Sequence, residues 1–126
     1  TEERQQVELT KISTDQNIDQ EPSNQAKEKL RNYEEITEVK AVNTKKDMLI
    51  AFDIEHHERF SLDQFEKELK KDMKKEFPDI KVHVSTDQKI ILEVERLEER
   101  LLKNDLSDKK LKKELKDIIK LSQEQT

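Results

Sequence analysis

The chain of 126 residues contains no cysteine and no glycine. Without cysteine it has no disulfide bond, no thiolate metal ligand and no cysteine nucleophile. Without glycine it lacks the backbone freedom on which phosphate-cradling loops and dinucleotide-binding turns depend. A P-loop and a Rossmann turn are therefore excluded, and no cofactor is expected.

Aromatic residues and long apolar runs are also scarce. There is no tryptophan, one tyrosine and four phenylalanines. No apolar run approaches the roughly 20 residues that span a bilayer, and no hydrophobic stretch of a signal peptide opens the sequence. As given, the chain is expected to be soluble.

Charged residues, in contrast, are abundant and of both signs. They make up 44% of the chain against 31% hydrophobic residues, so a core forms only if nearly every large apolar side chain is buried. The 30 acidic residues outnumber the 25 Lys and Arg, which gives a net charge of −5. An acidic chain without aromatic side chains between its lysines is not expected to bind nucleic acid.

The apolar pattern of residues 36–84 predicts the fold. Residues 36–42 and 48–54 alternate as the two strands of a hairpin, and residues 80–84 alternate as a third strand. Between them, residues 62–77 carry apolar side chains at helical spacing until Pro78 ends the helix. This order predicts an α+β fold, an αββαβ sandwich with helices on one face of a three-stranded sheet, followed by a C-terminal helical extension.

Three segments follow from the same pattern. Residues 1–22 are rich in Gln, Asp, Glu, Thr and Ser and are predicted to be a flexible tether. Residues 23–104 form the αββαβα core domain, in which Ser23 and Ser85 are candidate helix caps. Residues 105–126 form an amphipathic helix that either folds back on the preceding helix or pairs with a partner.

Reactive side chains do not form a convincing centre. His56, His57 and Glu58, with His83 as a distant ligand, are the one cluster that suggests a metal. Neighbouring residues of an extended chain point to opposite sides, however, and the spacing fits no known metal site. The carboxylates alternate with lysines on surface faces, and no nucleophile motif is present, so neither catalysis nor metal binding is expected.

Two surfaces are candidates for contacts. Lysines along the outer side of the helix at 62–77 could meet an anionic lipid or polymer, although a solvated face is the simpler interpretation in an acidic chain. The sheet face away from the helices is the better candidate, unless the N-terminal segment or the final helix covers it. The helix lysines are Lys67, Lys71, Lys74 and Lys75, and the sheet residues are Lys40, Val42, Leu49, Ala51, Lys81 and His83.

The stretches AVNTKKDMLIAFDI and DIKVHVSTDQ resemble the YhcN/YlaJ family of sporulation lipoproteins of endospore-forming bacteria. Members of that family tend to have a Val-Asn hairpin, a following alternating strand, and a late Val-Ser-Ala/Thr-Asp-Pro stretch that opens a helix. The resemblance covers about residues 24–104. It implies a non-enzymatic, extracytoplasmic protein anchored to a membrane through a lipidated N-terminal cysteine, which would precede this sequence.

The resemblance also implies a role in sporulation or in spore germination and outgrowth, with residues 1–22 as the tether between membrane and domain. The predicted element order is in addition similar to ring-building and BON-type modules of envelope assemblies, which stack on one another or on other proteins. The expected partners are therefore other envelope or spore proteins, or further copies of the chain in a ring or scaffold. A small hydrolase or metal-binding protein is the remaining alternative.

Overall fold

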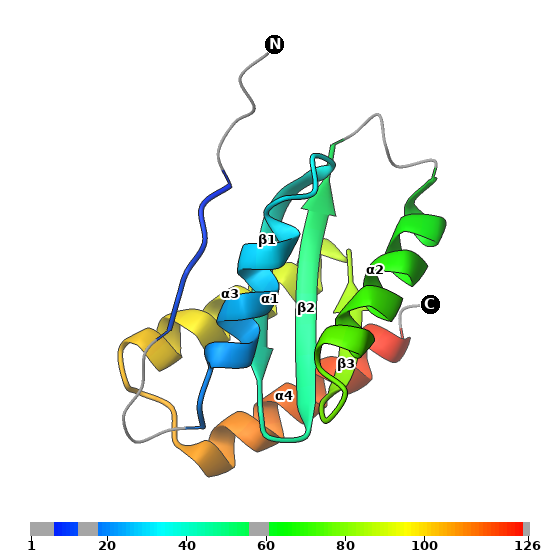
Figure 1. Cartoon of the computed structure of the whole chain (residues 1–126). Helices are drawn as coiled ribbons and strands as arrows, with labels where there is room; N and C mark the ends of the chain where they lie inside the picture. Colours follow the sequence, from blue (N-terminus) through cyan, green and yellow to red (C-terminus); the bar gives the residue numbers. More distant parts are fainter. Residues whose placement is uncertain (1–6, 13–17, 56–60, 125–126) are drawn as a thin grey trace.

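The computed structural model describes residues 7–12, 18–55 and 61–124. Its three strands form one mixed sheet in the order β1-β2-β3, in which β2 is antiparallel to β1 and parallel to β3. The α+β class, the three strands and the C-terminal helix are as predicted. The elements in chain order are α1 (Glu21–Leu30), β1 (Ile36–Asn43), β2 (Asp47–Ile54), α2 (Leu62–Glu76), β3 (Lys81–Ser85), α3 (Gln88–Leu102) and α4 (Asp108–Glu124) (Figure 1).

A tight turn without glycine joins β1 to β2. The Thr44 amide donates to the Asp47 carbonyl at 2.8 Å, and the Thr44 hydroxyl oxygen accepts from the Asp47 amide at 3.1 Å. A threonine side chain can stabilise a turn in this way because its hydroxyl bonds nearby backbone amides. The hairpin register pairs Val42 with Leu49.

The connection from β2 to β3 runs through α2, as a parallel pair of strands requires. Leu69, Met73 and Phe77 are buried against the sheet, as the apolar spacing predicts. Phe65 is partly buried and meets Phe52 of β2 edge to face, with ring centroids 5.8 Å apart. The apolar stripe of α2 therefore forms a core layer on this face of the sheet.

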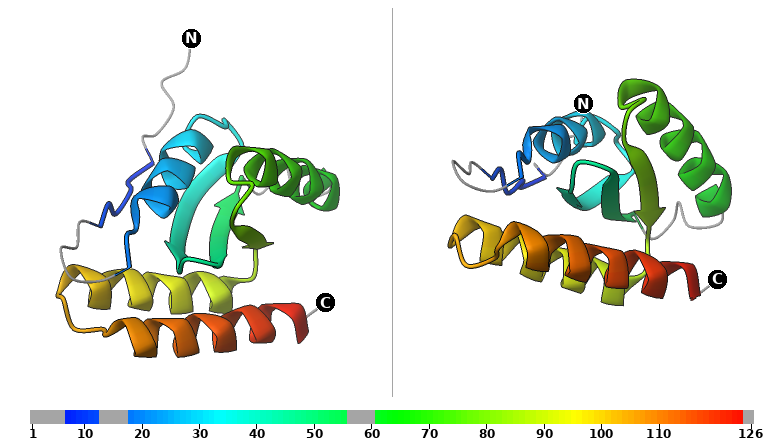
Figure 2. Two further views of the ribbon diagram at one scale, coloured as in Figure 1. Left: turned by 60° about the horizontal axis from the view of Figure 1, so that its bottom comes forward. Right: turned by 90° about the horizontal axis from the view of Figure 1, so that it is seen from below.

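The two helices of the predicted αββαβ unit lie on one face of the sheet, as expected, but helices cover the other face as well. α1 and α2 lie over one face, while α3 lies over the other with α4 beside it (Figure 2). The physical reason is that β1 and β2 are apolar on both sides. Ala41, Met48 and Ile50 pack with α1 and α2, whereas Val42 and Leu49 pack with α3 and α4.

The N-terminal segment is not a free tether over its described residues. Val7, Ile12 and Ile18 are buried in the two cores, and α1 already begins at Glu21, with Pro22 in its first turn. Residues 7–12 and 18–20 are called the strap below. Burial of its apolar side chains makes the strap part of the folded domain.

Both C-terminal helices have side-chain caps. The Asp87 carboxylate accepts from the amides of Lys89 at 2.8 Å and Ile90 at 3.3 Å, so Asp87 and not Ser85 caps α3. The Ser107 hydroxyl accepts from the Lys110 amide at 3.3 Å, as the sequence predicts for α4. Of the two predicted arrangements, α4 folds back on α3, and it buries Leu111, Leu115, Ile118 and Ile119 in the same core.

Candidate functional site

The apolar members of the predicted contact surface are core residues. Val42, Leu49 and Ala51 have no exposed surface because α3 lies directly over them, with Ile90 and Val94 in the same cluster. The expectation of an open sheet face is thereby corrected. These three side chains stabilise the domain and are not accessible to a partner.

The polar members of the same set lie on the two outer strands of the sheet, Lys40 on β1 and Lys81 and His83 on β3. The Lys40 ammonium on β1 lies 3.4 Å from the Glu95 carboxylate on α3, and His83 Nε2 on β3 lies 3.1 Å from Asp47 Oδ1. Lys81 is exposed at the start of β3. Since β1 and β3 flank β2 on opposite sides, these residues do not form one surface.

A buried ion pair joins the two helix layers. The Lys27 ammonium on α1 lies 2.8 Å from Oε2 of Glu98 on α3, and the two side chains are 0% and 1% exposed. The same Oε2 atom accepts from the Ala41 amide of β1 at 3.0 Å. Lys27 also donates to the Thr10 carbonyl of the strap. Four segments of the chain thus meet at one pair of charges.

Burial governs the electrostatics of this pair. Desolvation raises the pKa of Glu98, and the opposing effects of Lys27 and the Ala41 amide only partly offset it. Desolvation likewise lowers the pKa of Lys27, against the attraction of Glu98. The Glu98 Oε1 atom is buried without a hydrogen-bond partner among the described residues. The two side chains are therefore shielded from solvent among the described residues.

The strap is held by the side chain of Gln20. Its Oε1 atom accepts from the Asn43 amide at 3.0 Å, and its Nε2 atom donates to the Asn43 carbonyl at 2.7 Å. The Asn43 carboxamide in turn accepts from the Ser23 amide at 3.1 Å and donates to the Asp19 carbonyl at 3.0 Å. The reciprocal bonds fix the end of β1 to the start of α1.

Two further side chains, those of Asn24 and Asp108, bond the strap at Ile12 and Ile18. The Asn24 carboxamide bonds both backbone groups of Ile12, accepting at 3.0 Å and donating at 2.9 Å. The Ile18 amide donates to the Asp108 carboxylate at the start of α4, at 2.9 Å. The strap therefore connects α1, β1 and α4, which are far apart in the sequence.

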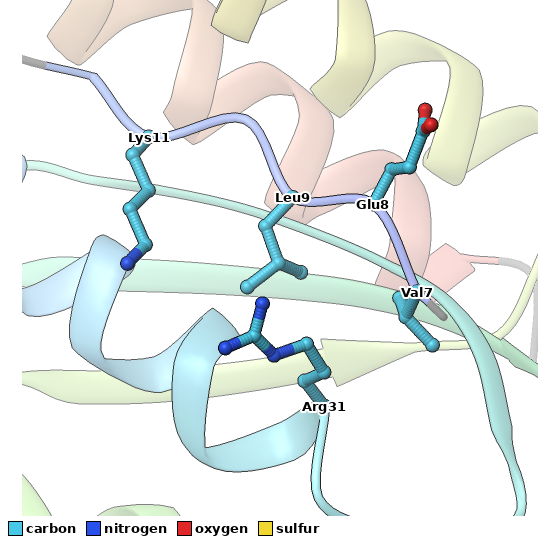
Figure 3. Close-up of a pocket in the computed structure, with 5 residues that line it drawn as sticks. All are labelled: Val7, Glu8, Leu9, Lys11 and Arg31. Atoms are coloured by element: carbon cyan, nitrogen blue, oxygen red, sulfur yellow. The ribbon is translucent and has the colours of Figure 1, made fainter. Parts of the chain in front are cut away.

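A shallow, open cavity of about 440 Å³ lies between the strap and the end of α1 (Figure 3). Its two cations share the Glu28 carboxylate, which lies 2.8 Å from the Lys11 ammonium and also contacts Arg31, and Glu8 adds a second negative charge to the lining. The hydrogen bond from Lys11 lowers the pKa of Glu28. This leaves the cavity little net charge with which to hold an anion. Its lining residues are Val7, Glu8, Leu9, Lys11 and Arg31.

The residues that the sequence offers as possible metal ligands are only partly described. His56, His57 and Glu58 lie outside the described residues, and His83 bonds Asp47. Across residues 7–12, 18–55 and 61–124, no group of three or more His, Cys, Asp or Glu side chains is arranged to hold a metal ion. No helix in the same ranges is long and apolar enough to cross a bilayer.

The exposed surface carries two kinds of feature outside these buried networks. Leu92 and Leu102 on α3 are each 52% exposed, which is unusual for large apolar side chains in this domain. Lysines line the outer sides of both α2 and α4, where they are exposed or partly exposed. These surfaces, and not the sheet, are available for contacts.

The sequence interpretation missed the Lys27–Glu98 pair, although a signal was present. Glu98 lies four residues after Val94 and seven after Ile91, so it shares the buried side of α3. Lys27 lies next to Ala26 and three residues before Leu30, on the buried side of α1. A charge of each sign on an apolar helix face indicates a buried pair, because an unpaired buried charge is too costly.

Comparison with known proteins gives one match. The family model described as Sporulation lipoprotein YhcN/YlaJ matches residues 1–120. No curated protein and no solved structure matches the chain. The likeness of the fold to ring-building modules therefore stays a prediction.

Proposed function

The chain belongs to the YhcN/YlaJ family of sporulation lipoproteins, and we propose that it is a non-enzymatic domain of the spore envelope that acts through contacts with other proteins. Its role would lie in sporulation or in spore germination and outgrowth. The membrane would be reached through a lipid anchor on the N-terminal side.

The proposal is supported by what the buried polar groups bond to. Lys27 and Glu98 are the buried pair with shifted pKa values, and they bond to each other, to β1 and to the strap. Gln20, Asn24 and Asn43 likewise bond backbone groups of distant segments. Groups that are paired and covered in this way hold the fold together, while catalytic groups must reach a substrate. Contacts at the outer surface are then the function that remains.

The outer side of α3 is the surface best suited to a protein contact. Leu92 and Leu102 are both about half exposed, at 52% each. Around them stand charged residues such as Glu99 and Lys103. Apolar side chains with a charged rim are typical of protein interfaces.

Photo-crosslinking in sporulating cells tests the proposal. A photoreactive amino acid at position 92 or 102 of the full-length lipoprotein should give a discrete adduct, whereas the same group at the exposed turn residue Lys45 should not. An adduct of twice the mass of the chain would identify self-association in a scaffold. If neither α3 position gives an adduct while the protein is present in the envelope, the contact proposal is overturned.

A further inference from the structure

One side of α4 carries only lysines and a glutamine. At about 100° per residue, five lysines fall within an arc of about 100° on the helix surface, opposite the buried Leu111 and Ile118. Asp108, Glu114 and Asp117 all lie outside that arc. We call these residues the α4 lysine stripe: Lys109, Lys112, Lys113, Lys116 and Lys120, all exposed.

The stripe is poorly neutralised within the chain. Lys113 lies 3.2 Å from Asp117, and both side chains remain mostly exposed, at 77% and 63%. Among the described residues, no other lysine of the stripe forms an ion pair. Lysines at positions i and i+4, such as Lys112 and Lys116, repel each other along the helix. The arrangement leaves a concentrated positive charge on an acidic protein.

The lysines of α2 provide a contrast within the same domain. Lys67, Lys71 and Lys74 also share one side of their helix, but Asp63 lies one turn before Lys67 on that side. Glu68 adds a second negative charge beside them. Carboxylates therefore lie on and beside the lysine side of α2, whereas no carboxylate lies within the arc of the α4 lysine stripe over its three turns.

We propose that the α4 lysine stripe docks on a bilayer that contains anionic phospholipid. Lysine is a compact point charge that each anionic headgroup attracts, and several lysines near one surface act together. The apolar side of α4 is already used in the core of the domain, so contact is electrostatic and does not involve insertion. A lipoprotein works next to a bilayer, which makes this anionic surface the one within reach. The inference goes beyond the proposed protein contacts at α3.

The fold places the stripe away from the outer end of the strap. Val7 is buried in the core cluster on the α1 and α2 side of the sheet, while α4 belongs to the cluster on the other side (Figure 2). The stripe therefore lies on the side of the sheet opposite to the buried Val7.

Vesicle co-sedimentation with the full chain tests the docking. At about 50 mM salt the chain should bind vesicles of equal parts phosphatidylglycerol and phosphatidylcholine, and not vesicles of phosphatidylcholine alone. Binding should weaken at least about tenfold at roughly 500 mM salt, because salt screens exposed charges. No binding to the anionic vesicles at low salt, or equal binding to both kinds, would overturn the proposal.

Two variants with the same loss of charge locate the surface. Replacing all five stripe lysines by Gln should reduce binding to the anionic vesicles about tenfold or more. Replacing Lys67, Lys70, Lys71, Lys74 and Lys75 of α2 by Gln should change it by less than about threefold. Circular dichroism of both variants shows that each remains folded. An equal loss in both variants would mean that only net charge matters, and would refute the assignment to α4.

Competition with a soluble acidic polymer distinguishes a bilayer from an acidic polypeptide as the partner of the stripe. Polyglutamate at matched charge should compete only weakly with the vesicles, because its charges do not form a plane against which a straight helix can lie. Strong competition by polyglutamate would assign the stripe to an acidic polypeptide and overturn the lipid proposal. Neither result affects the crosslinks expected at positions 92 and 102, so failure here leaves the α3 contact separately testable.

Discussion

Lys27 of α1 and Glu98 of α3 reach each other from opposite sides of the sheet, with 2.8 Å between Nζ and Oε2. They meet beside the edge strand β1, where Glu98 also accepts the outward-pointing amide of Ala41. An edge strand exposes unpaired backbone groups that another chain could bind. The pair therefore closes this part of the edge, and Gln20 does the same at Asn43.

Lys27→Met should destabilise the domain, and more so at neutral than at acidic pH. Burial raises the pKa of Glu98 above its ordinary value of 4.5, and removing Lys27 takes away the attraction that opposes this shift. A raised folded-state pKa favours folding below pH 4.5, and this contribution is lost as the pH rises through the folded-state value. We expect a loss of about 3–5 kcal/mol near pH 7.5 and a smaller loss near pH 4 in urea denaturation.

The double variant Lys27→Met with Glu98→Gln is the control for this prediction. The glutamine keeps an acceptor for the Ala41 amide but carries no charge to bury. Its stability should lie within about 1 kcal/mol of the parent chain at both pH values, since apolar replacement of a buried pair is often neutral. A Lys27→Met penalty that is the same at both pH values would show that lost packing, and not the unpaired carboxylate, dominates.

Gln20→Ala should release the strap. The substitution leaves the amide and carbonyl of Asn43 without their partners, at a cost of roughly 1–3 kcal/mol. Limited trypsin digestion should then cleave after Lys11 faster than in the parent chain. Gln25→Ala, at an exposed position of α1, is the matched control and should leave the cleavage rate unchanged. Equal rates in all three proteins would argue against the role of Gln20.

Periodicity sufficed for much of this fold because strands and helices repeat their burial every two or every three to four residues. Met48, Ile50, Phe52 and Ile54 share one core cluster with Leu69 and Met73, as the period-two and helical spacings predict. The family resemblance, drawn from the hairpin and the third strand, is confirmed by the match over residues 1–120. Local patterns of this kind do not depend on which element packs on which.

The second sheet face and the strap could not be predicted in the same way. Val42 and Leu49 are apolar, but their sequence alone does not reveal that α3 crosses over them. The side chain of Gln20 bonds the backbone of Asn43, which lies 23 positions away. Every residue has the same backbone groups, so the sequence does not indicate this partner. The polar composition of this segment suggested that it is free. It is nevertheless held, because a few hydrogen bonds and three buried apolar side chains are enough to fix it.

Leu49→Ala tests whether the α3 side of the sheet is core. Leu49 has no exposed surface, so removing three carbon atoms should leave a cavity and cost about 2–5 kcal/mol. Leu92→Ala removes the same atoms from a side chain that is 52% exposed and should cost much less, under about 1 kcal/mol. Thermal and urea denaturation compare the two. Similar small losses would mean that α3 does not cover the sheet in solution.

Leu115→Ala tests whether α4 belongs to the domain or waits for a partner. Leu115 is 1% exposed in the core beneath α3 and α4, and Arg100 of α3 holds Glu114 beside it at 2.7 Å. The substitution should cost about 2–5 kcal/mol and keep a single unfolding transition, because α4 unfolds together with the sheet. Lys116→Ala, one position further on the exposed side, should change stability by under about 0.5 kcal/mol. An unchanged midpoint for Leu115→Ala would mean that α4 is held by something other than this core. In that case its lysines would no longer have the fixed outward direction on which docking to a bilayer depends.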